Sequence, residues 1–298
     1  NTMIDLLTEF PALPRTVLRD FKRGIDTGFK EFSRSYGEAI ETFFYPLLKF
    51  LVFIEQLLLA TPWPIFIGIV AFLGYWATRS LKLVMGVIIA LFVVGLFGMW
   101  EDTMETTGII VVSTLVAILI GIPLGILMSK SDRAQTIITP ILDFMQTLPP
   151  FVYLIPVVML LGIGKVPGLI AVVIYAVPPV VRLTNLGIRE VDNEIIEAAE
   201  SFGATPKQKL YKVQIPLAMP TIFAGINQTI MMALAMVIIA SMIGVKGLGL
   251  EVLRSITNQY LAIGLLNGTA IVVIAIIFDR ISQAYGKRVQ EHRKGGHH

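Results

Sequence analysis

The sequence contains no cysteine, and its only histidines are His292, His297 and His298 at the extreme C-terminus. Thiol chemistry, zinc coordination and histidine acid-base catalysis therefore have almost no raw material. The closing residues 295–298 resemble the remnant of a purification tag and are left out of the functional reasoning. Charge is scarce as well, because 15% of the residues are charged against roughly 25% in soluble globular chains.

Apolar residues dominate instead, at 55% of the chain, with a mean hydropathy of +0.77. The isoelectric point near 9.0 could point to nucleic acid. The net charge is only +3, however, and the lysines and arginines are scattered among apolar runs, so we exclude nucleic acid as a partner. This composition predicts an all-α membrane protein that contacts lipid.

Seven stretches approach the roughly 17 to 25 apolar residues that a helix needs to cross a bilayer core of about 30 Å. They run over residues 62–77, 81–99, 106–129, 137–162, 167–185, 218–243 and 261–281. The stretches 106–129 and 218–243 contain no charged residue, which favours a membrane span over a soluble core helix. We find no internal repeat and expect about seven transmembrane helices.

Lysines and arginines in the short connections predict the orientation, because cytoplasmic loops retain positive charge. With the C-terminus inside, the cytoplasm receives the basic residues near 79–82, 130–133, 182–212 and after 279. The opposite side receives Lys165, Lys246 and Arg254, together with an acidic group at 101–105. We expect the N-terminus on the extracytoplasmic side of a bacterial inner membrane.

The sequence before the first span divides into two segments. Residues 1–40 read as an extracytoplasmic extension, and residues 41–60 form an apolar stretch interrupted by Lys49, Glu55 and Gln56. We interpret 41–60 as an amphipathic interfacial helix, with an eighth span as the alternative. The permease domain then covers 61–285 and includes a polar loop at 187–216, and a basic tail covers 286–298.

The polar loop begins with a predicted short helix. Asp192, Asn193 and Glu194 supply capping and acidic groups at its start, and apolar residues then recur at helical spacing up to Phe202. Gly203 supplies a left-handed C-terminal stop. The first half of the loop is therefore a helix that ends at a glycine.

A second helix is predicted to follow at once. Thr205 caps it, Pro206 occupies its first position, and Gln208 completes a capping box. We expect Pro216 and Pro220 to end it where the chain re-enters the membrane. The loop is thus an amphipathic helix-glycine-helix unit on the cytoplasmic face, which we call the knuckle (residues 192–216).

The knuckle resembles a known signature. The residues Glu197-Ala198-Ala199, Gly203 after three more positions, and Val213-Gln214-Ile215-Pro216 nine residues later are similar to the EAA signature of bacterial ABC importer permeases. Val213 and Ile215 replace the usual Ile and Leu but keep apolar bulk. The resemblance implies that the knuckle docks into an ATPase subunit, through the coupling residues Glu197, Ala198, Ala199, Phe202, Gly203, Ile215 and Pro216.

Further strings resemble the quaternary-amine branch of that family, typified by glycine betaine and proline betaine permeases. They are residues 143–156, 162–168, 217–221, Gln228, 240–243 and 247–249. The resemblance implies a homodimer with the MetI-like fold of type I importers, two ATPase subunits inside, and a substrate-binding protein or fused binding domain outside. It leaves glycine betaine, proline betaine, choline, carnitine and trimethylamine N-oxide open as substrates.

The phosphate-cradling string Gly-x-x-x-x-Gly-Lys-Ser/Thr does not occur in the sequence. We therefore expect a subunit that is not itself an enzyme and holds no cofactor, with ATP and magnesium bound by the partner ATPase. A permease for another small polar solute remains the alternative. A secondary transporter would show repeat symmetry and midmembrane ion ligands, and a membrane enzyme would show clustered catalytic groups; we find none of these.

Polar residues and prolines inside the spans are candidates for the translocation pathway or its gate, because polar groups there are costly unless they face protein or water. The candidates are Asp143, Gln146, Pro149, Pro150, Tyr153, Asn227 and Gln228. Interhelical hydrogen bonds are the alternative for Asn227 and Gln228. Ion pairing or snorkelling is the alternative for Asp143 and for Arg182, and ordinary kinks are the alternative for the prolines.

Overall fold

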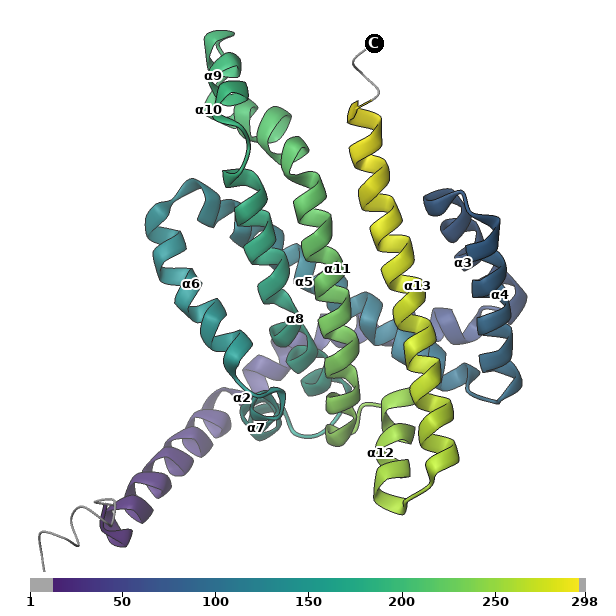
Figure 1. Ribbon diagram of the computed structural model, residues 1–298. Helices are drawn as coiled ribbons and strands as arrows, with labels where there is room; N and C mark the ends of the chain where they lie inside the picture. The colour runs from purple at the N-terminus through teal and green to yellow at the C-terminus, as the bar shows by residue number, and fades with distance from the viewer. Residues whose placement is uncertain (1–12, 295–298) are drawn as a thin grey trace, which may run out of the picture.

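The computed structural model describes residues 13–294, with side chains described up to residue 286, and this part of the chain is helical without a strand (Figure 1). The suggested tag remnant and the first twelve residues of the predicted extension lie outside the described residues. The helices in chain order are α2 (Arg15–Ala60), α3 (Trp63–Thr78), α4 (Leu81–Leu96), α5 (Trp100–Lys130), α6 (Asp132–Thr147), α7 (Pro150–Leu161), α8 (Lys165–Arg189), α9 (Asn193–Ser201), α10 (Pro206–Gln208), η1 (Lys209–Gln214), α11 (Ile215–Ala240), η2 (Ser241–Ile243), α12 (Leu248–Asn258) and α13 (Leu261–Lys294).

The centre of the bundle is α8, which packs along α5 on one side and α11 on the other (Figure 1). Glycines allow the close approach. A Cβ atom at Gly125 of α5 would lie 2.5 Å from the Cβ of Thr184, and one at Gly225 of α11 would lie 2.9 Å from the Cβ of Leu183. Small residues at helix contacts are the usual way in which membrane helices pack, because lipid gives no hydrophobic force between them.

Five helical segments of the described chain are long and apolar enough to cross a membrane: 15–60, 100–130, 165–189, 206–243 and 261–286. The predicted span at 137–162 is divided into α6 and α7, which meet at a bend of 100° and raise the number to six if they count as one span. The helices α3 and α4 match the first two predicted spans but have only 16 residues each. The fold class is confirmed, and the predicted count of seven is not.

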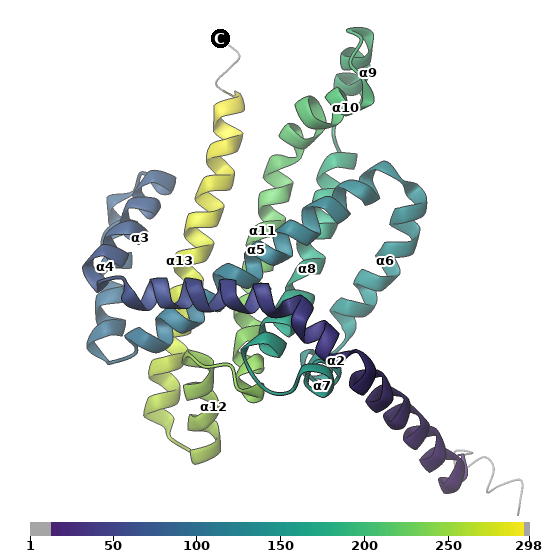
Figure 2. The same cartoon turned by 180° about the vertical axis from the view of Figure 1, so that it is seen from behind.

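The helix α2 continues through the boundary that the sequence suggested near residue 40. It runs unbroken from Arg15 to Ala60 with Pro46 inside it, and only Leu51 and Glu55 are buried. Figure 2 shows α2 running crosswise to α8, α11 and α13. By length and composition α2 could be a span, but its direction differs from that of the central helices.

The prediction that Pro216 and Pro220 end the second knuckle helix was wrong. Both lie in α11, Pro216 in its first turn and Pro220 further on, and the helical chain runs on from residue 206 to 243. The connection is the π-helical turn η1, after which the Ile215 N–H bonds to the Leu210 carbonyl five residues earlier. Such a wider turn accommodates a local change in the hydrogen-bond ladder, so a nearby proline need not end the helix.

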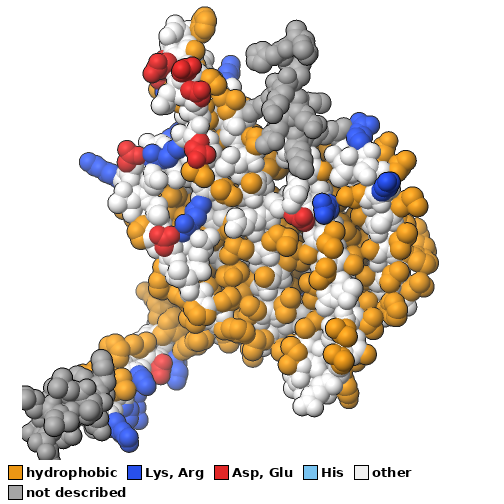
Figure 3. Space-filling view, viewed as in Figure 1, with side chains coloured by type: hydrophobic (Ala, Val, Ile, Leu, Met, Phe, Trp, Pro, Cys, Tyr) orange, Lys and Arg blue, Asp and Glu red, His pale blue; other side chains and the backbone are white. Residues whose placement is uncertain are grey.

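The two ends of the bundle differ in character. α9, α10 and the last turns of α13 lie at one end, and α12 lies at the other (Figure 1). In Figure 3 hydrophobic side chains cover the middle of the visible face, whereas charged side chains gather around α9 and along the protruding start of α2. This pattern fits a molecule whose middle is surrounded by lipid.

Candidate coupling site and pathway residues

The first helix of the knuckle is capped at both ends as the sequence predicts. The Asp192 carboxylate accepts a hydrogen bond of 2.9 Å from the Glu194 N–H at the start of α9. Gly203 adopts the left-handed φ of 78° just after its end. The Gly203 N–H donates to the Glu200 carbonyl at 2.8 Å, and the Ala204 N–H donates to Ala199 at 3.0 Å. These bonds satisfy carbonyls that would otherwise be left open at the helix end.

The second half of the knuckle is fixed to the first. Thr205 and Gln208 form the predicted capping box, with the Gln208 N–H bonded to the Thr205 hydroxyl at 3.3 Å and the Thr205 N–H bonded to the Gln208 side chain at 2.9 Å. The Lys209 ammonium pairs with the Glu200 carboxylate, which joins η1 to α9. The knuckle is therefore a built unit with defined caps at both helix starts.

The tip of the knuckle presents apolar and small residues to solvent. Phe202 is 94% exposed, and Glu197 and Ala198 are exposed beside the half-buried Ala199. A Cβ at Gly203 would meet nothing within 4 Å, so the space around this glycine is open. An exposed aromatic ring at the end of a capped helix is the kind of group that anchors protein interfaces.

The last two predicted coupling residues lie at the base of the knuckle. Ile215 packs against a buried apolar cluster formed by Ile188, Leu210, Ala218 and Ile222, and Pro216 is half-buried beside it. This cluster joins the end of α8 to η1 and the start of α11. The structure thus brings Glu197, Ala198, Ala199, Phe202 and Gly203 together at the tip and separates the other two from them.

Two of the pathway candidates, Asp143 and Tyr153, each contact a neighbouring helix. The Asp143 carboxylate of α6 forms an ion pair with the Arg182 guanidinium of α8. The Tyr153 hydroxyl of α7 donates to the Met145 carbonyl, and its ring meets the Tyr175 ring edge-on with centroids 6.1 Å apart. These contacts tie the bent α6–α7 pair to α8, and they favour the pairing interpretation for Asp143 and Arg182.

Asn227 is engaged between two helices. Its amide donates a hydrogen bond of 2.9 Å to the Asp279 carboxylate of α13, which also accepts one of 2.7 Å from Gln283. The geometry favours the interhelical interpretation for Asn227. Gln228 is exposed, and Gln146 is half-buried. The sequence reasoning missed Asp279, although a carboxylate near the end of an apolar run is a signal that could have drawn attention to it.

The two adjacent prolines mark the break in the predicted fourth span. Pro149 caps α7 and Pro150 is its first residue, so both occupy positions where a missing N–H costs nothing. The residue before a proline avoids helical geometry, and the Leu148 backbone is accordingly extended. The 100° bend is therefore a direct consequence of this Leu-Pro-Pro sequence.

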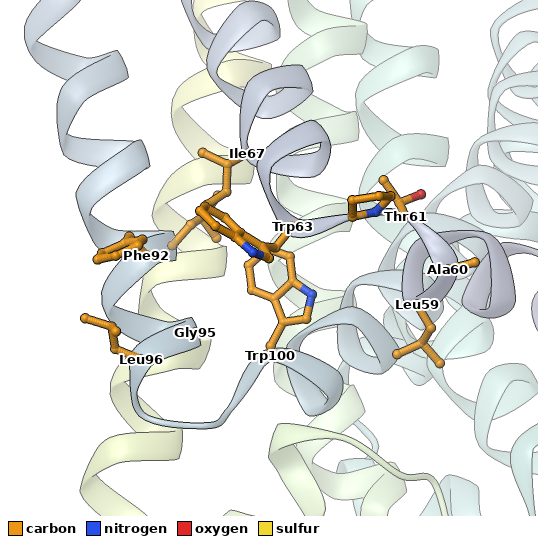
Figure 4. A pocket seen from close by; sticks show the side chains of 11 residues that line it. Leu59, Ala60, Thr61, Trp63, Ile67, Phe92, Gly95, Leu96 and Trp100 are labelled. Atoms are coloured by element: carbon orange, nitrogen blue, oxygen red, sulfur yellow. The ribbon is translucent and has the colours of Figure 1, made fainter.

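A pocket of about 590 Å³ lies at the edge of the bundle, away from α6–α8 (Figure 4). Its lining is almost wholly apolar and comes from the end of α2, from α3 and α4, and from the start of α5, with Trp63 and Trp100 prominent. None of the candidate pathway residues lines it, and we assign it no role in translocation.

The family of the chain follows from comparison with known proteins. Residues 117–291 match the model of the binding-protein-dependent transport system inner membrane component, which is more than half of the chain. The matched region contains the whole knuckle and the central helix α8. The protein belongs to this family of permeases.

Three relatives show how closely the chain fits one branch of the family. It is 49% identical to the glycine betaine/proline betaine transport system permease protein ProW of Escherichia coli over 78% of this chain and 66% of the relative. It is 49% identical to the glycine betaine/carnitine transport permease protein GbuB of Listeria monocytogenes, over 78% and 83%. The glycine betaine transport system permease protein OpuAB of Bacillus subtilis is 41% identical over 91% and 95%.

The fold also has a solved counterpart. A chain of the MetNI methionine ABC transporter, in a structure of its inward facing conformations, superposes with a TM-score of 0.54 at 22% identity, covering 63% of this chain and 92% of that chain. This likeness confirms the MetI-like helical fold.

Proposed function

We propose that this protein is the membrane-spanning subunit of an ATP-driven importer for quaternary amines and related compatible solutes. The observation that carries the proposal is the rigid, exposed knuckle at one end of a lipid-facing helical bundle whose relatives are glycine betaine permeases. The substrate class includes glycine betaine, proline betaine, choline, carnitine and trimethylamine N-oxide, since relatives named for several of these solutes match the chain.

The proposed assembly has two copies of this chain, two ATPase subunits and a substrate-binding protein or fused binding domain. The ATPase binds ATP and magnesium, and it docks on the tip of the knuckle, where Phe202 offers an exposed ring and Glu197 offers a charge. The base residues Ile215 and Pro216 act indirectly, by joining the knuckle to α8 and α11. Movement of the ATPase is then transmitted through the knuckle to α8 and α11.

The proposed orientation has the knuckle and the C-terminus in the cytoplasm and α12 on the outer side of a bacterial inner membrane. Residues 41–60 of α2 lie along the membrane, in line with the crosswise direction of this helix (Figure 2). We assign the extension 1–40, of which the structure describes the part from residue 13, to the outer side. The permease domain proper is 61–285 and the basic tail is 286–298. In this arrangement α2 does not add a span.

We place the pathway along α6 and α7, beside α8. Asp143 and Gln146 lie in α6, Pro150 and Tyr153 lie in α7, and Pro149 lies between the two helices. The 100° break between α6 and α7 leaves helix ends inside the membrane domain. Nonhelical backbone at that depth is tolerated where it lines a cavity or is buried in protein. Asn227 and Gln228 of α11 are weaker candidates, because Asn227 is bonded to Asp279.

The function is tested by the ATPase rate of the reconstituted complex with and without substrate-loaded binding protein, across glycine betaine, proline betaine, choline, carnitine and trimethylamine N-oxide. Stimulation by one or more loaded forms is the expected result and names the substrate. Stimulation by none of these solutes, in a complex that hydrolyses ATP, would contradict the substrate class and favour another small polar solute. Uptake that proceeds without ATP would instead indicate a secondary transporter.

The docking role of the knuckle is tested separately with Gly203→Asp and Glu197→Lys. Each adds a charge or reverses one at the tip, so we expect loss of ATPase docking and uptake with normal insertion into the membrane. Glu38→Lys is the matched control, because Glu38 is exposed on α2, away from the knuckle. Normal uptake in both knuckle variants would contradict the assignment.

A further inference from the structure

An ion pair between a buried carboxylate and a partly exposed ammonium joins α2 to the start of α8, at the end of α8 opposite to the knuckle. Glu55 of α2 is only 3% exposed, and its carboxylate pairs with the ammonium of Lys165, the first residue of α8. The approach of α2 to α5 at this point is close, since a Cβ at Gly108 would lie 3.0 Å from the Cγ of Glu55. The pair thus sits where α2, α5 and α8 meet.

The pair is poorly suited to serve stability alone. A lysine at the first position of a helix opposes the helix dipole. The Glu55 carboxylate is buried whereas its partner Lys165 is 29% exposed, so the pair carries a desolvation cost that apolar side chains would not carry. One oxygen of the carboxylate, Oε1 of Glu55, is also buried without a hydrogen-bond partner among the described residues. The buried and partly unsatisfied Glu55 carboxylate costs free energy of folding, and a role in transport would explain why the protein has it.

The helix α2 also contacts the end of α7, which lies on the other side of the α7–α8 turn. The Ser33 hydroxyl donates a hydrogen bond of 2.9 Å to the Met159 carbonyl near the end of α7. A Cβ at Gly37 would lie 3.3 Å from the Leu160 carbonyl oxygen. Contacts from one helix therefore bracket the turn: Ser33 and Gly37 hold its start, and Glu55 holds its end.

The bracketed turn contains two glycines in unusual backbone conformations. Gly162 and Gly164 have φ values of 76° and 151°, which other residues rarely adopt. The Gly164 N–H donates to the Ile243 carbonyl at 2.9 Å, so the turn also contacts η2, which directly follows α11. A shift of this turn would consequently move the outer ends of α7, α8 and α11 relative to one another.

We propose that Glu55 is a positioning residue for transport: through Lys165 it holds the α7–α8 turn, and with it the outer end of the pathway, in its resting arrangement. In this proposal α2 limits the movement of α7 and α8 at that end through its contacts with both helices. The inference rests on the proposed function, in which the binding protein acts at the outer end and the ATPase at the knuckle. A higher ATPase rate in the absence of binding protein then indicates that the outer end leaves its resting arrangement without a stimulus.

The test uses the complete complex of permease, ATPase and binding protein in lipid vesicles, and measures the unstimulated ATPase rate and the substrate taken up per ATP. We expect Glu55→Gln and Lys165→Gln each to raise the unstimulated rate about fivefold or more, the lower range of typical coupling between sites. Uptake per ATP falls in parallel. The charge swap, Glu55→Lys with Lys165→Glu, restores both quantities.

A purely structural role is distinguished by the double variant Glu55→Leu with Lys165→Leu. Replacing an ion pair that includes a buried charge by apolar groups is often neutral for folding. This variant therefore removes the ion pair from an assembled complex even if the single variants fail to fold. We expect it to assemble normally and keep the raised unstimulated rate. If it behaves like the wild type, the proposal is overturned.

Asp20→Asn provides the matched control, since Asp20 lies on the same helix, is exposed and pairs with the neighbouring Arg19 at 3.8 Å. It is expected to leave both quantities at wild-type values. A charge swap that fails to restore coupling in an assembled complex would also overturn the proposal. A wild-type complex that no loaded binding protein stimulates would contradict the proposed function instead, independently of Glu55.

Discussion

Removing the ring of Phe202 should weaken ATPase docking without affecting the fold of the permease. The side chain is 94% exposed and makes no contact that holds the knuckle together, so its truncation to alanine costs the isolated chain little. On docking, the ring would be buried. Full burial of a phenylalanine side chain contributes about 1.5–3 kcal/mol, which corresponds to roughly ten- to hundredfold weaker binding for Phe202→Ala.

The assay is a titration of the ATPase subunit onto the permease held in lipid nanodiscs, read as a dissociation constant. Phe97→Ala is the matched control, since Phe97 is 59% exposed in the turn between α4 and α5. We expect the control to bind as the wild type does. A dissociation constant unchanged by Phe202→Ala would refute the reasoning that the exposed ring is an anchor of the interface.

Three further predictions concern packing, backbone conformation and charge. Gly125→Ala places a Cβ 2.5 Å from the nearest side-chain atom of α8, and overpacking typically costs about 1–3 kcal/mol. The melting temperature of this variant should therefore be lower than that of Gly68→Ala, where the added Cβ meets nothing within 4 Å. Equal melting temperatures of the two variants would contradict the close packing of α5 on α8. Gly203→Ala should weaken docking more than Gly203→Asn, because asparagine tolerates the φ of 78° better; equal affinities would contradict this. Asp143→Asn should lower uptake, and exchanging Asp143 with Arg182 should restore it, because the ion pair joins α6 to α8. An exchange without recovery would contradict a role of the ion pair in transport.

The knuckle was predictable from sequence because local rules determine it. Its caps at Asp192 and Thr205 and its stop at Gly203 depend on residues within a few positions, and each appears in the structure as the sequence indicated. Long apolar runs likewise predicted the central helices α5, α8 and α11, because the length needed to cross a bilayer is fixed.

The remainder depends on tertiary contacts that no local pattern reveals. Glu55 joins α2 to α8 through Lys165, whereas the sequence showed Glu55 only as an interruption of an apolar run. The continuation of α11 through Pro216 relies on the π-helical turn before it. Asn227 could not be assigned to the pathway or to packing until its partner Asp279, 52 positions away, was known.

ATP-driven uptake of radiolabelled glycine betaine into vesicles that contain the permease, its ATPase and its binding protein tests the central claim most directly. We predict accumulation that requires ATP and the binding protein and is lost in Gly203→Asp. Accumulation driven by an ion gradient in the absence of ATP, or undiminished in Gly203→Asp, would contradict the account.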